Sequence, residues 1–165
     1  MNEQARHARI EVDIPAQRLR LLFGGHVARE YPISSGKAGT GQLQGSGCTP
    51  LGQHRVRIKI GVGAATGSVF VGRRATGEIY SAELAQRYPE RDWILTRILW
   101  LTGAEPGFNR GGNIDSLRRY IYIHGTPDSE PMGKPASHGC IRMRNHDVLE
   151  LFDLVQNGTP VEILG

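Results

Sequence analysis

Cysteine is scarce in this sequence, which contains only Cys48 and Cys140 among 165 residues. At most one internal disulfide can form, so a small scaffold stapled by several disulfides is excluded and free thiols in a reducing compartment are expected. Long apolar runs are also missing, because no stretch approaches the ~18 consecutive apolar residues of a membrane helix. Residues 1–12 are polar and lack the apolar segment of a secretory signal. We therefore expect a cytoplasmic chain with no membrane partner.

Blocks of like charge are absent as well. The 20 basic and 16 acidic residues give a net charge of +4, and the basic residues are spread along the chain without a run of five. This distribution argues against nucleic acid as a partner. Attraction to acidic ligands is one interpretation of the positive charge, and ordinary solvated faces are the other.

Glycine, in contrast, is abundant at 22 of 165 residues, about 13% against a typical ~7%. This content favours turns and close backbone approaches over long helices. The length, with 39% hydrophobic and 22% charged residues, fits one soluble domain over residues 1–165. We predict a mainly β (α+β) single domain of mixed strands with few short helices.

Polar and apolar residues alternate in several short segments, the pattern of half-buried strands. A segment rich in Gly, Ser and Thr, residues 34–51, interrupts them and predicts a long loop. The expected strands are residues 9–14, 18–23, 27–33, 54–60, 68–72, 92–101, 119–123 and 160–164.

Two helices are expected. Ser81 is placed to cap a short helix that ends near Pro89, and Asn145 to cap a longer one that Gly158 stops. The longer helix has apolar residues at i, i+3, i+4 and i+7, namely Val148, Leu151, Phe152 and Val155.

The residues with the clearest chemistry are His124 and Cys140. An apolar run at 120–123 predicts a buried strand that holds His124 rigidly at its end, and a turn of small residues before Cys140 can present a thiol. A free cysteine with a pKa of about 8.5 needs a base or a shifted pKa to react at neutral pH, and a nearby histidine supplies the base. Backbone N–H groups around Gly139 could stabilise an oxyanion.

Each of these residues also has an ordinary interpretation. A lone cysteine is usually a small buried hydrophobic residue, and a lone histidine can belong to the core. A zinc site is a further alternative, but it needs more ligands, and the other histidines show no ligand spacing with this cluster: His7, His26, His54 and His146. We therefore rank covalent catalysis first and expect no metal.

Cys48 lies in the expected loop without an evident basic partner, so we assign it no catalytic role, although a redox link to Cys140 stays open. The glycine-rich segment 61–67 has its third glycine one place late for a dinucleotide-binding loop. We expect no cofactor.

The segments around the two candidate residues carry a family resemblance. His124-Gly125-Thr126, Met132-Gly133-Lys134-Pro135 and 137–143 (SHGCIRM) resemble the signature of the L,D-transpeptidase (YkuD-like) catalytic domain. The resemblance continues at residues 12–13, 17–19, 34–37, 49–52 and 158–161, and so covers nearly the whole chain.

The resemblance implies a mainly β catalytic fold in which Cys140 is the nucleophile and His124 its base. Gly125 would orient the histidine through its backbone carbonyl group. The oxyanion site would be shaped by Ser137, His138 and Gly139. Substrate binding is expected at Tyr122 and Arg142, with an ion pair that holds the loop as the alternative role for Arg142.

Members of this family act on murein tetrapeptide stems, at the bond between the L-centre of a diamino acid in position 3 and the terminal D-Ala, and carbapenem β-lactams inhibit them. The resemblance implies the same substrates, peptidoglycan fragments included, for this chain. With water as the acceptor of the acyl group the enzyme would be an L,D-carboxypeptidase. With an amine it would form 3-3 cross-links or exchange D-amino acids.

Because the chain as given shows no export signal, it resembles the leaderless carboxypeptidases of murein recycling. We therefore expect water as the acceptor and a cytoplasmic location. If a leader had been removed, the location would be periplasmic. A zinc peptidase is the remaining alternative.

Overall fold

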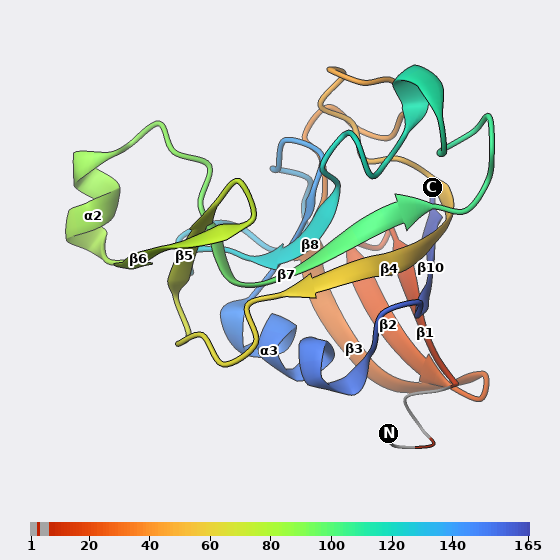
Figure 1. Ribbon diagram of the computed structural model, residues 1–165, viewed down its shortest axis with the longest axis horizontal. Helices are drawn as coiled ribbons and strands as arrows, with labels where there is room; N and C mark the ends of the chain where they lie inside the picture. Colours follow the sequence, from red (N-terminus) through yellow and green to blue (C-terminus); the bar gives the residue numbers. More distant parts are fainter. Residues whose placement is uncertain (1–2, 4–6) are drawn as a thin grey trace.

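The computed structural model describes residue 3 and residues 7–165, and strands dominate it (Figure 1). This confirms the mainly β prediction. The strands are β1 (Ala8–Asp13), β2 (Arg18–Phe23), β3 (His26–Ser34), β4 (Gly52–Ile60), β5 (Ser68–Val71), β6 (Arg74–Ile79), β7 (Ile94–Gly103), β8 (Tyr122–Gly125), β9 (Ile141–Met143) and β10 (Pro160–Leu164). The helical elements are α2 (Ala82–Arg87), α3 (Asn145–Leu154) and the 3-10 turn η1 (Gly112–Ile114).

The strands form one sheet in the order β4-β10-β1-β2-β3-β9-β8-β7-β5-β6. Strand β4 pairs with β10 on one side and with β7 on the other, so the first eight strands in this order close into a ring. The β5–β6 hairpin continues from β7 and leads to α2, which projects from one end of the molecule (Figure 1). The closed ring leaves few free sheet edges, which protects the sheet from edge pairing.

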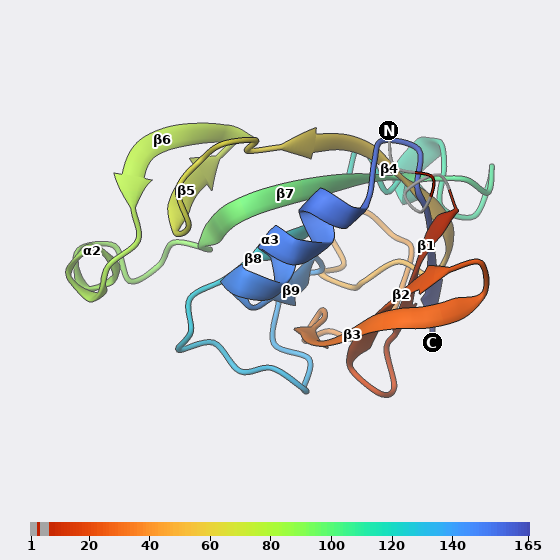
Figure 2. The same ribbon diagram turned by 90° about the horizontal axis from the view of Figure 1, so that it is seen from below.

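The main core fills the space inside this ring, between the β7–β8–β9 side and the β1–β3 side. Alternate residues of β1 and β2 point inward, where Ile10 pairs with Leu21 and Val12 with Leu19, all fully buried. Helix α3 lies between the β7–β8–β9 side and the β1–β3 side (Figure 2). Its apolar residues join both sides in one cluster, at the spacing the sequence predicts: Val148, Leu151 and Phe152, with Val155 directly after the helix end.

Several strand boundaries differ from the sequence predictions. The expected strand 119–123 is wrong at both ends, because β8 begins at Tyr122 and runs to Gly125. Tyr120 has φ +57, a left-handed conformation that a strand does not use. Strands β6 and β9 were not predicted, since β6 carries an exposed polar sequence and β9 has only three residues. The predicted loop does follow β3 and ends before β4.

One of the two predicted N-terminal helix caps is confirmed. Ser81 caps α2, and its hydroxyl accepts a hydrogen bond from the Leu84 N–H at 3.1 Å. Asn145 is not the cap of α3: Arg144 takes that position, and the Asn145 Oδ1 accepts from the Thr96 hydroxyl at 2.6 Å. Gly158, with φ +90, lies in the turn before β10 rather than at the helix end.

In the described part of the chain, no helix is long and apolar enough to cross a membrane.

Candidate active site

Strands β8 and β9 lie side by side and present two different faces. They run parallel, with His124 opposite Arg142 and Ile123 opposite Ile141. Because side chains alternate along a strand, Ile123 and Ile141 point into the main core. The other face carries Tyr122, His124, Cys140 and Arg142, and there Tyr122 and Cys140 share a smaller cluster. The topology therefore places the histidine and the cysteine, 16 residues apart in sequence, on one face.

The His124 imidazole is held in one orientation. It is 1% exposed, and its Nδ1 lies 2.6 Å from the carbonyl oxygen of Gly125. A carbonyl oxygen only accepts hydrogen bonds, so Nδ1 carries the proton and Nε2 is left as a base. Burial lowers the pKa of His124, and the Gly125 carbonyl and the Asp92 carboxylate offset this only in part. The ring is thus neutral at neutral pH.

Gly125 has no room for a side chain. A Cβ atom there would lie 2.6 Å from the carbonyl oxygen of Leu95 and would collide with Oδ1 of Asn145. The close approach of β7 and α3 to this residue fixes the carbonyl group that accepts the hydrogen bond from His124 Nδ1. The family resemblance implies that the Gly125 carbonyl group orients the histidine, and this geometry fits that role.

The Cys140 thiol is hydrogen-bonded to backbone groups. Its Sγ accepts from the Tyr122 N–H at 3.3 Å and donates to the carbonyl oxygen of Tyr120 at 3.2 Å. Burial raises the pKa of Cys140 to about 12. Among the described residues no hydrogen bond joins Sγ to His124. The resting pair is therefore a neutral thiol and a neutral imidazole on one face.

The turn that carries the thiol is braced internally and by the long loop. Ser137 Oγ donates to the Cys140 carbonyl oxygen at 2.5 Å and accepts from the Gly139 N–H at 3.2 Å. Gly139 has φ +125, and a Cβ there would lie 3.1 Å from the carbonyl oxygen of Cys48. The Thr49 hydroxyl donates to the Gly139 carbonyl oxygen at 2.9 Å. Glycine at 139 is needed for both its conformation and its space.

Cys48 itself belongs to this brace. Its carbonyl oxygen accepts from Nη2 of Arg119 at 2.7 Å, and Nη1 of Arg119 reaches the Gly41 carbonyl oxygen at 3.2 Å. Both cysteines are free thiols. The loop around Cys48 is thus fixed by Arg119, and its Thr49 hydroxyl bonds to the Cys140 turn.

Asp92 is a site residue that sequence reasoning missed. Its carboxylate accepts from Arg142 Nη2 at 3.0 Å and lies 3.3 Å from His138 Nδ1. Burial acts to raise the pKa of Asp92. The positive charges that His124, Arg142 and His138 carry at the acidic pH where Asp92 titrates, together with the Arg142 hydrogen bond, outweigh burial and lower this pKa. Asp92 lies 48 residues before Cys140, at the first position of the expected strand 92–101, and no motif in the sequence marks it.

A cavity of about 400 Å³ opens beside the thiol turn. Tyr120 and His138 line it together with Arg118, Arg119 and the loop glycines Gly45 and Gly47. The carbonyl group of Tyr120, which accepts from the Cys140 thiol, connects this cavity to the nucleophile candidate. It is large enough for part of a peptide chain.

Arg73, also missed, lies against the Tyr120 ring. Its Nη1 donates to the Tyr122 hydroxyl at 3.0 Å, and its guanidinium carbon lies 4.6 Å from the centre of the Tyr120 ring and 4.9 Å from that of Trp100. Arg73 follows β5 at the tip of the β5–β6 hairpin, with φ +66. The hairpin thus brings a cation to a rim of aromatic side chains around Tyr122.

Comparison with known proteins agrees with this geometry. The family described as the L,D-transpeptidase catalytic domain, YkuD, matches residues 7–163.

The chain belongs to this L,D-transpeptidase family.

Curated relatives share shorter segments. A Bacillus licheniformis protein that carries the name L,D-transpeptidase YkuD is 51% identical over 59 residues, 35% of this chain and 36% of that protein. ErfK/SrfK of Salmonella typhimurium, named a probable L,D-transpeptidase, is 48% identical over 48 residues, 29% of this chain and 16% of that protein. The matched segments thus span about a third or less of these relatives' lengths.

Solved L,D-transpeptidases share the fold. LdtMt1 in complex with imipenem aligns with 96% of this chain and 59% of its own at 22% identity, with a TM-score of 0.58. L,D-transpeptidase 3 of Mycobacterium tuberculosis, bound to a faropenem-derived adduct, aligns with 96% of this chain and 60% of its own at 17% identity, also with a TM-score of 0.58.

In this L,D-transpeptidase domain the Arg142 side chain is held by the loop before β9 and by Asp92. It is 6% exposed and forms ion pairs with Asp92 at 3.0 Å and with Glu130 at 3.3 Å, and it also donates to the Ala136 carbonyl oxygen. These contacts favour the loop-holding alternative for Arg142 over substrate binding. Tyr122, the other expected substrate residue, lies on the same face as His124 and Cys140, with its hydroxyl bonded to Arg73.

The zinc alternative lacks a ligand set in the described residues of this domain, which contain no group of three or more His, Cys, Asp and Glu arranged to hold a metal ion. His54, one of the histidines considered, instead bonds to the Ser116 hydroxyl at 2.7 Å.

Proposed function

We propose that this domain is a cysteine acyltransferase that cleaves the L,D bond before the terminal D-Ala of a peptidoglycan stem tetrapeptide. One observation carries the proposal. Cys140 shares a strand face with His124, whose Nδ1 is bound by the Gly125 carbonyl so that Nε2 is left as a base. Membership of the L,D-transpeptidase family supports the substrate class.

In the proposed reaction the thiol turns from the Tyr120 carbonyl group toward His124. Sγ attacks the carbonyl carbon of the diamino acid while its proton passes to Nε2 of His124. The raised pKa of Cys140 favours transfer during attack over a preformed thiolate. His124 then gives this proton to the nitrogen of the departing D-Ala, the C–N bond breaks, and a thioester on Cys140 remains.

The oxyanion of the tetrahedral intermediate needs hydrogen-bond donors near Cys140. The Gly139 N–H already donates to Ser137 Oγ at 3.2 Å, so we assign the role to the backbone N–H groups of His138 and Cys140. Ser137 and Gly139 then act by shaping the turn that presents these groups.

A cation is needed to hold the terminal carboxylate of the substrate, because a carboxylate removed from water is costly without one. Arg142 is occupied by two acids, whereas the Arg73 guanidinium has one hydrogen bond, to the neutral Tyr122 hydroxyl. We assign the carboxylate to Arg73. Tyr122 orients this guanidinium.

We propose water as the acceptor, so that the thioester is hydrolysed to the tripeptide, as expected from the sequence. Transfer to an amine is the second candidate, and the transpeptidase names of the relatives favour it. Incubation of free tetrapeptide with a large excess of amine acceptor separates them by mass spectrometry. Tripeptide plus D-Ala supports hydrolysis. Cross-linked dimer or D-amino-acid exchange product, with little tripeptide, would refute it.

The same experiment with a chelator addresses the zinc peptidase. We expect turnover to be unaffected by chelation, because the proposed chemistry uses only the thiol, the imidazole and backbone groups. Loss of turnover that zinc restores would contradict the cysteine mechanism.

The LdtMt1 complex with imipenem supports the further proposal that carbapenems acylate Cys140.

A further inference from the structure

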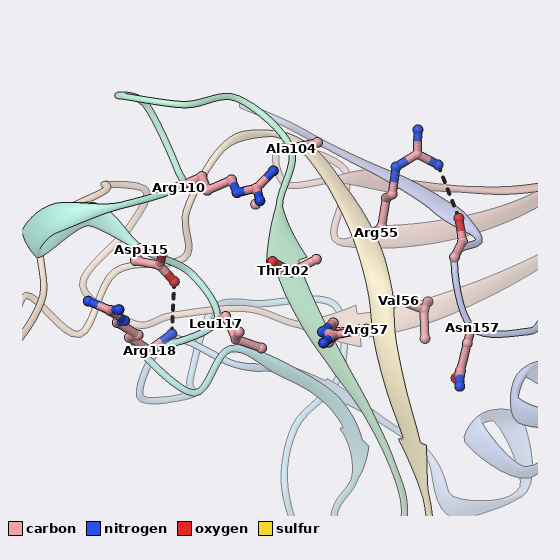
Figure 3. Close-up of a pocket in the computed structure, with 12 residues that line it drawn as sticks. Arg55, Val56, Arg57, Thr102, Ala104, Arg110, Asp115, Leu117, Arg118 and Asn157 are labelled. Atoms are coloured by element: carbon pink, nitrogen blue, oxygen red, sulfur yellow. Dashed lines mark hydrogen bonds between the residues drawn. The ribbon is translucent and has the colours of Figure 1, made fainter.

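A second, larger cavity of about 830 Å³ has neither Cys140 nor His124 in its lining, and Figure 3 shows the residues that line it. One wall is the ribbon of β4 and β7, and the other is the segment 104–118 that follows β7. Guanidinium groups come from both walls: Arg55 and Arg57 from β4, and Arg110 and Arg118 from the segment. Thr102 and Asn157 add neutral polar groups.

The positive charge in this cavity is not balanced by acids. None of its four arginines forms an ion pair with another described residue, and Arg55 donates instead to the Gly158 carbonyl oxygen at 3.2 Å. The acid in the lining is Asp115. Its carboxylate already accepts from the backbone N–H groups of Gly111 at 2.7 Å and Arg118 at 3.0 Å. Four cations therefore face one acid that is committed to its own turn.

The arginines are carried by a rigid frame. Arg55 pairs with Thr102 in the β4–β7 ladder. The segment 104–118 is held by Asn109, which is fully buried and donates to the Gln53 carbonyl oxygen at 2.9 Å. It is held a second time by Ser116, whose hydroxyl lies 2.7 Å from Nε2 of the buried His54. Buried polar contacts of this kind fix the backbone positions from which the four exposed arginine side chains extend.

The number of cations points to the ligand chemistry. One guanidinium is enough for a single carboxylate, whereas adjacent phosphoryl groups carry more charge and more acceptor oxygens. The volume fits a small molecule. We propose that this cavity binds a small molecule with two adjacent phosphoryl groups. Arg118 also lines the cavity beside the Cys140 turn, so the two cavities are neighbours. The proposal does not depend on the peptidase activity.

The test is titration calorimetry of the whole chain with inorganic pyrophosphate, with citrate as a carboxylate anion of similar charge. We expect saturable binding at one site that weakens as salt is added, and weaker binding of citrate. The proposal is overturned if pyrophosphate does not bind, if citrate binds as tightly, or if long-chain polyphosphate binds and pyrophosphate does not, since that last result would indicate a polymer-binding surface.

Variants locate the site. The double variant Arg57→Gln, Arg110→Gln should weaken pyrophosphate binding by about tenfold or more, because each residue loses a charge-assisted hydrogen bond. The control is Arg18→Gln, Arg87→Gln, which removes the same charge from exposed positions outside the cavity. An equal loss of pyrophosphate binding in both variants would show that only the overall charge of the chain matters and would overturn the proposed site. Thermal unfolding and tetrapeptide turnover report on the fold of each variant.

Discussion

The two faces of the β8–β9 pair are made from alternate residues of the same short strands, yet they are stabilised in different ways. The inner face, with Ile123 and Ile141, packs against the core that α3 completes. The outer face, with His124 and Cys140, is positioned by hydrogen bonds between these side chains and backbone groups. Loss of an inner residue should therefore reduce stability, and loss of an outer one should reduce chemistry.

The outer face also depends on segments far away in the sequence. Thr49 bonds to the Gly139 carbonyl group, Asp92 reaches His138 and Arg142, and the hairpin tip brings Arg73. The inner face needs only apolar side chains of suitable volume. The difference shows why a site can be recognised by its motif while its supporting residues escape notice.

Replacement of Cys140 by Ala should have the largest effect on the outer face. We expect turnover to fall by about 10⁴-fold or more, the range for loss of a covalent nucleophile, with the fold retained. Steady-state assays of tripeptide release measure this. Cys48→Ala is the matched control and should retain activity, because Cys48 contacts the site through its backbone. Full activity in Cys140→Ala would contradict the assignment.

The second test removes the base. His124→Ala should slow acylation by roughly 10²-fold or more, as for a lost general base. Stopped-flow measurement of carbapenem acylation gives the rate directly, and circular dichroism checks the fold. An unchanged acylation rate in a folded variant would remove His124 from the mechanism.

On the inner face, Ile141→Ala should destabilise the domain by about 2–5 kcal/mol, because it leaves a cavity in a fully buried position. Denaturant unfolding measures the change. Turnover per folded molecule should be largely retained, although Ile141 directly follows the nucleophile in sequence. A large loss of turnover with unchanged stability would break the distinction between the two faces.

Arg73 gives a smaller expected effect. Arg73→Gln should raise KM for the tetrapeptide by about tenfold, since one charge-assisted contact to the substrate carboxylate is lost, with little change in kcat. Arg142→Gln differs in that it breaks buried ion pairs and should reduce stability. If Arg142→Gln raised KM at unchanged stability and Arg73→Gln did nothing, the carboxylate would belong to Arg142.

The pH profile should show the weakest effect. Burial lowers the pKa of His124, and the reaction needs the neutral ring, so activity should fall only as the pH drops below about 6.5. The Asp92 charge acts to raise this pKa, so Asp92→Asn should move the acid limb to still lower pH. An acid limb of kcat/KM above pH 7 would contradict the buried, neutral imidazole.

The sequence predicted the parts of the fold and site that follow local rules. Alternation placed β1, β2 and β4, and the 3.6-residue spacing placed the apolar face of α3. The motif indicated His124 and Cys140, and the structure brings them to one face. Their catalytic roles stay predictions.

The missed features depend on long-range contacts. Strand β9 has three residues and exists because β3 and β8 flank it. The Asn145 side chain accepts a hydrogen bond from the Thr96 hydroxyl instead of capping α3. Asp92 contacts its partners only when the sheet forms. None of these partners lies near its residue in sequence, so no local pattern could predict them.

The proposed mechanism requires Cys140, on the outer face, to be the acylated nucleophile. Intact-mass spectrometry after incubation with imipenem, followed by peptide mapping, tests it most directly. We predict one adduct per chain, on the peptide that contains Cys140, in the wild type and in Cys48→Ala, and none in Cys140→Ala. An adduct on Cys48, or no adduct on the wild type, would contradict the assignment of Cys140 as the nucleophile.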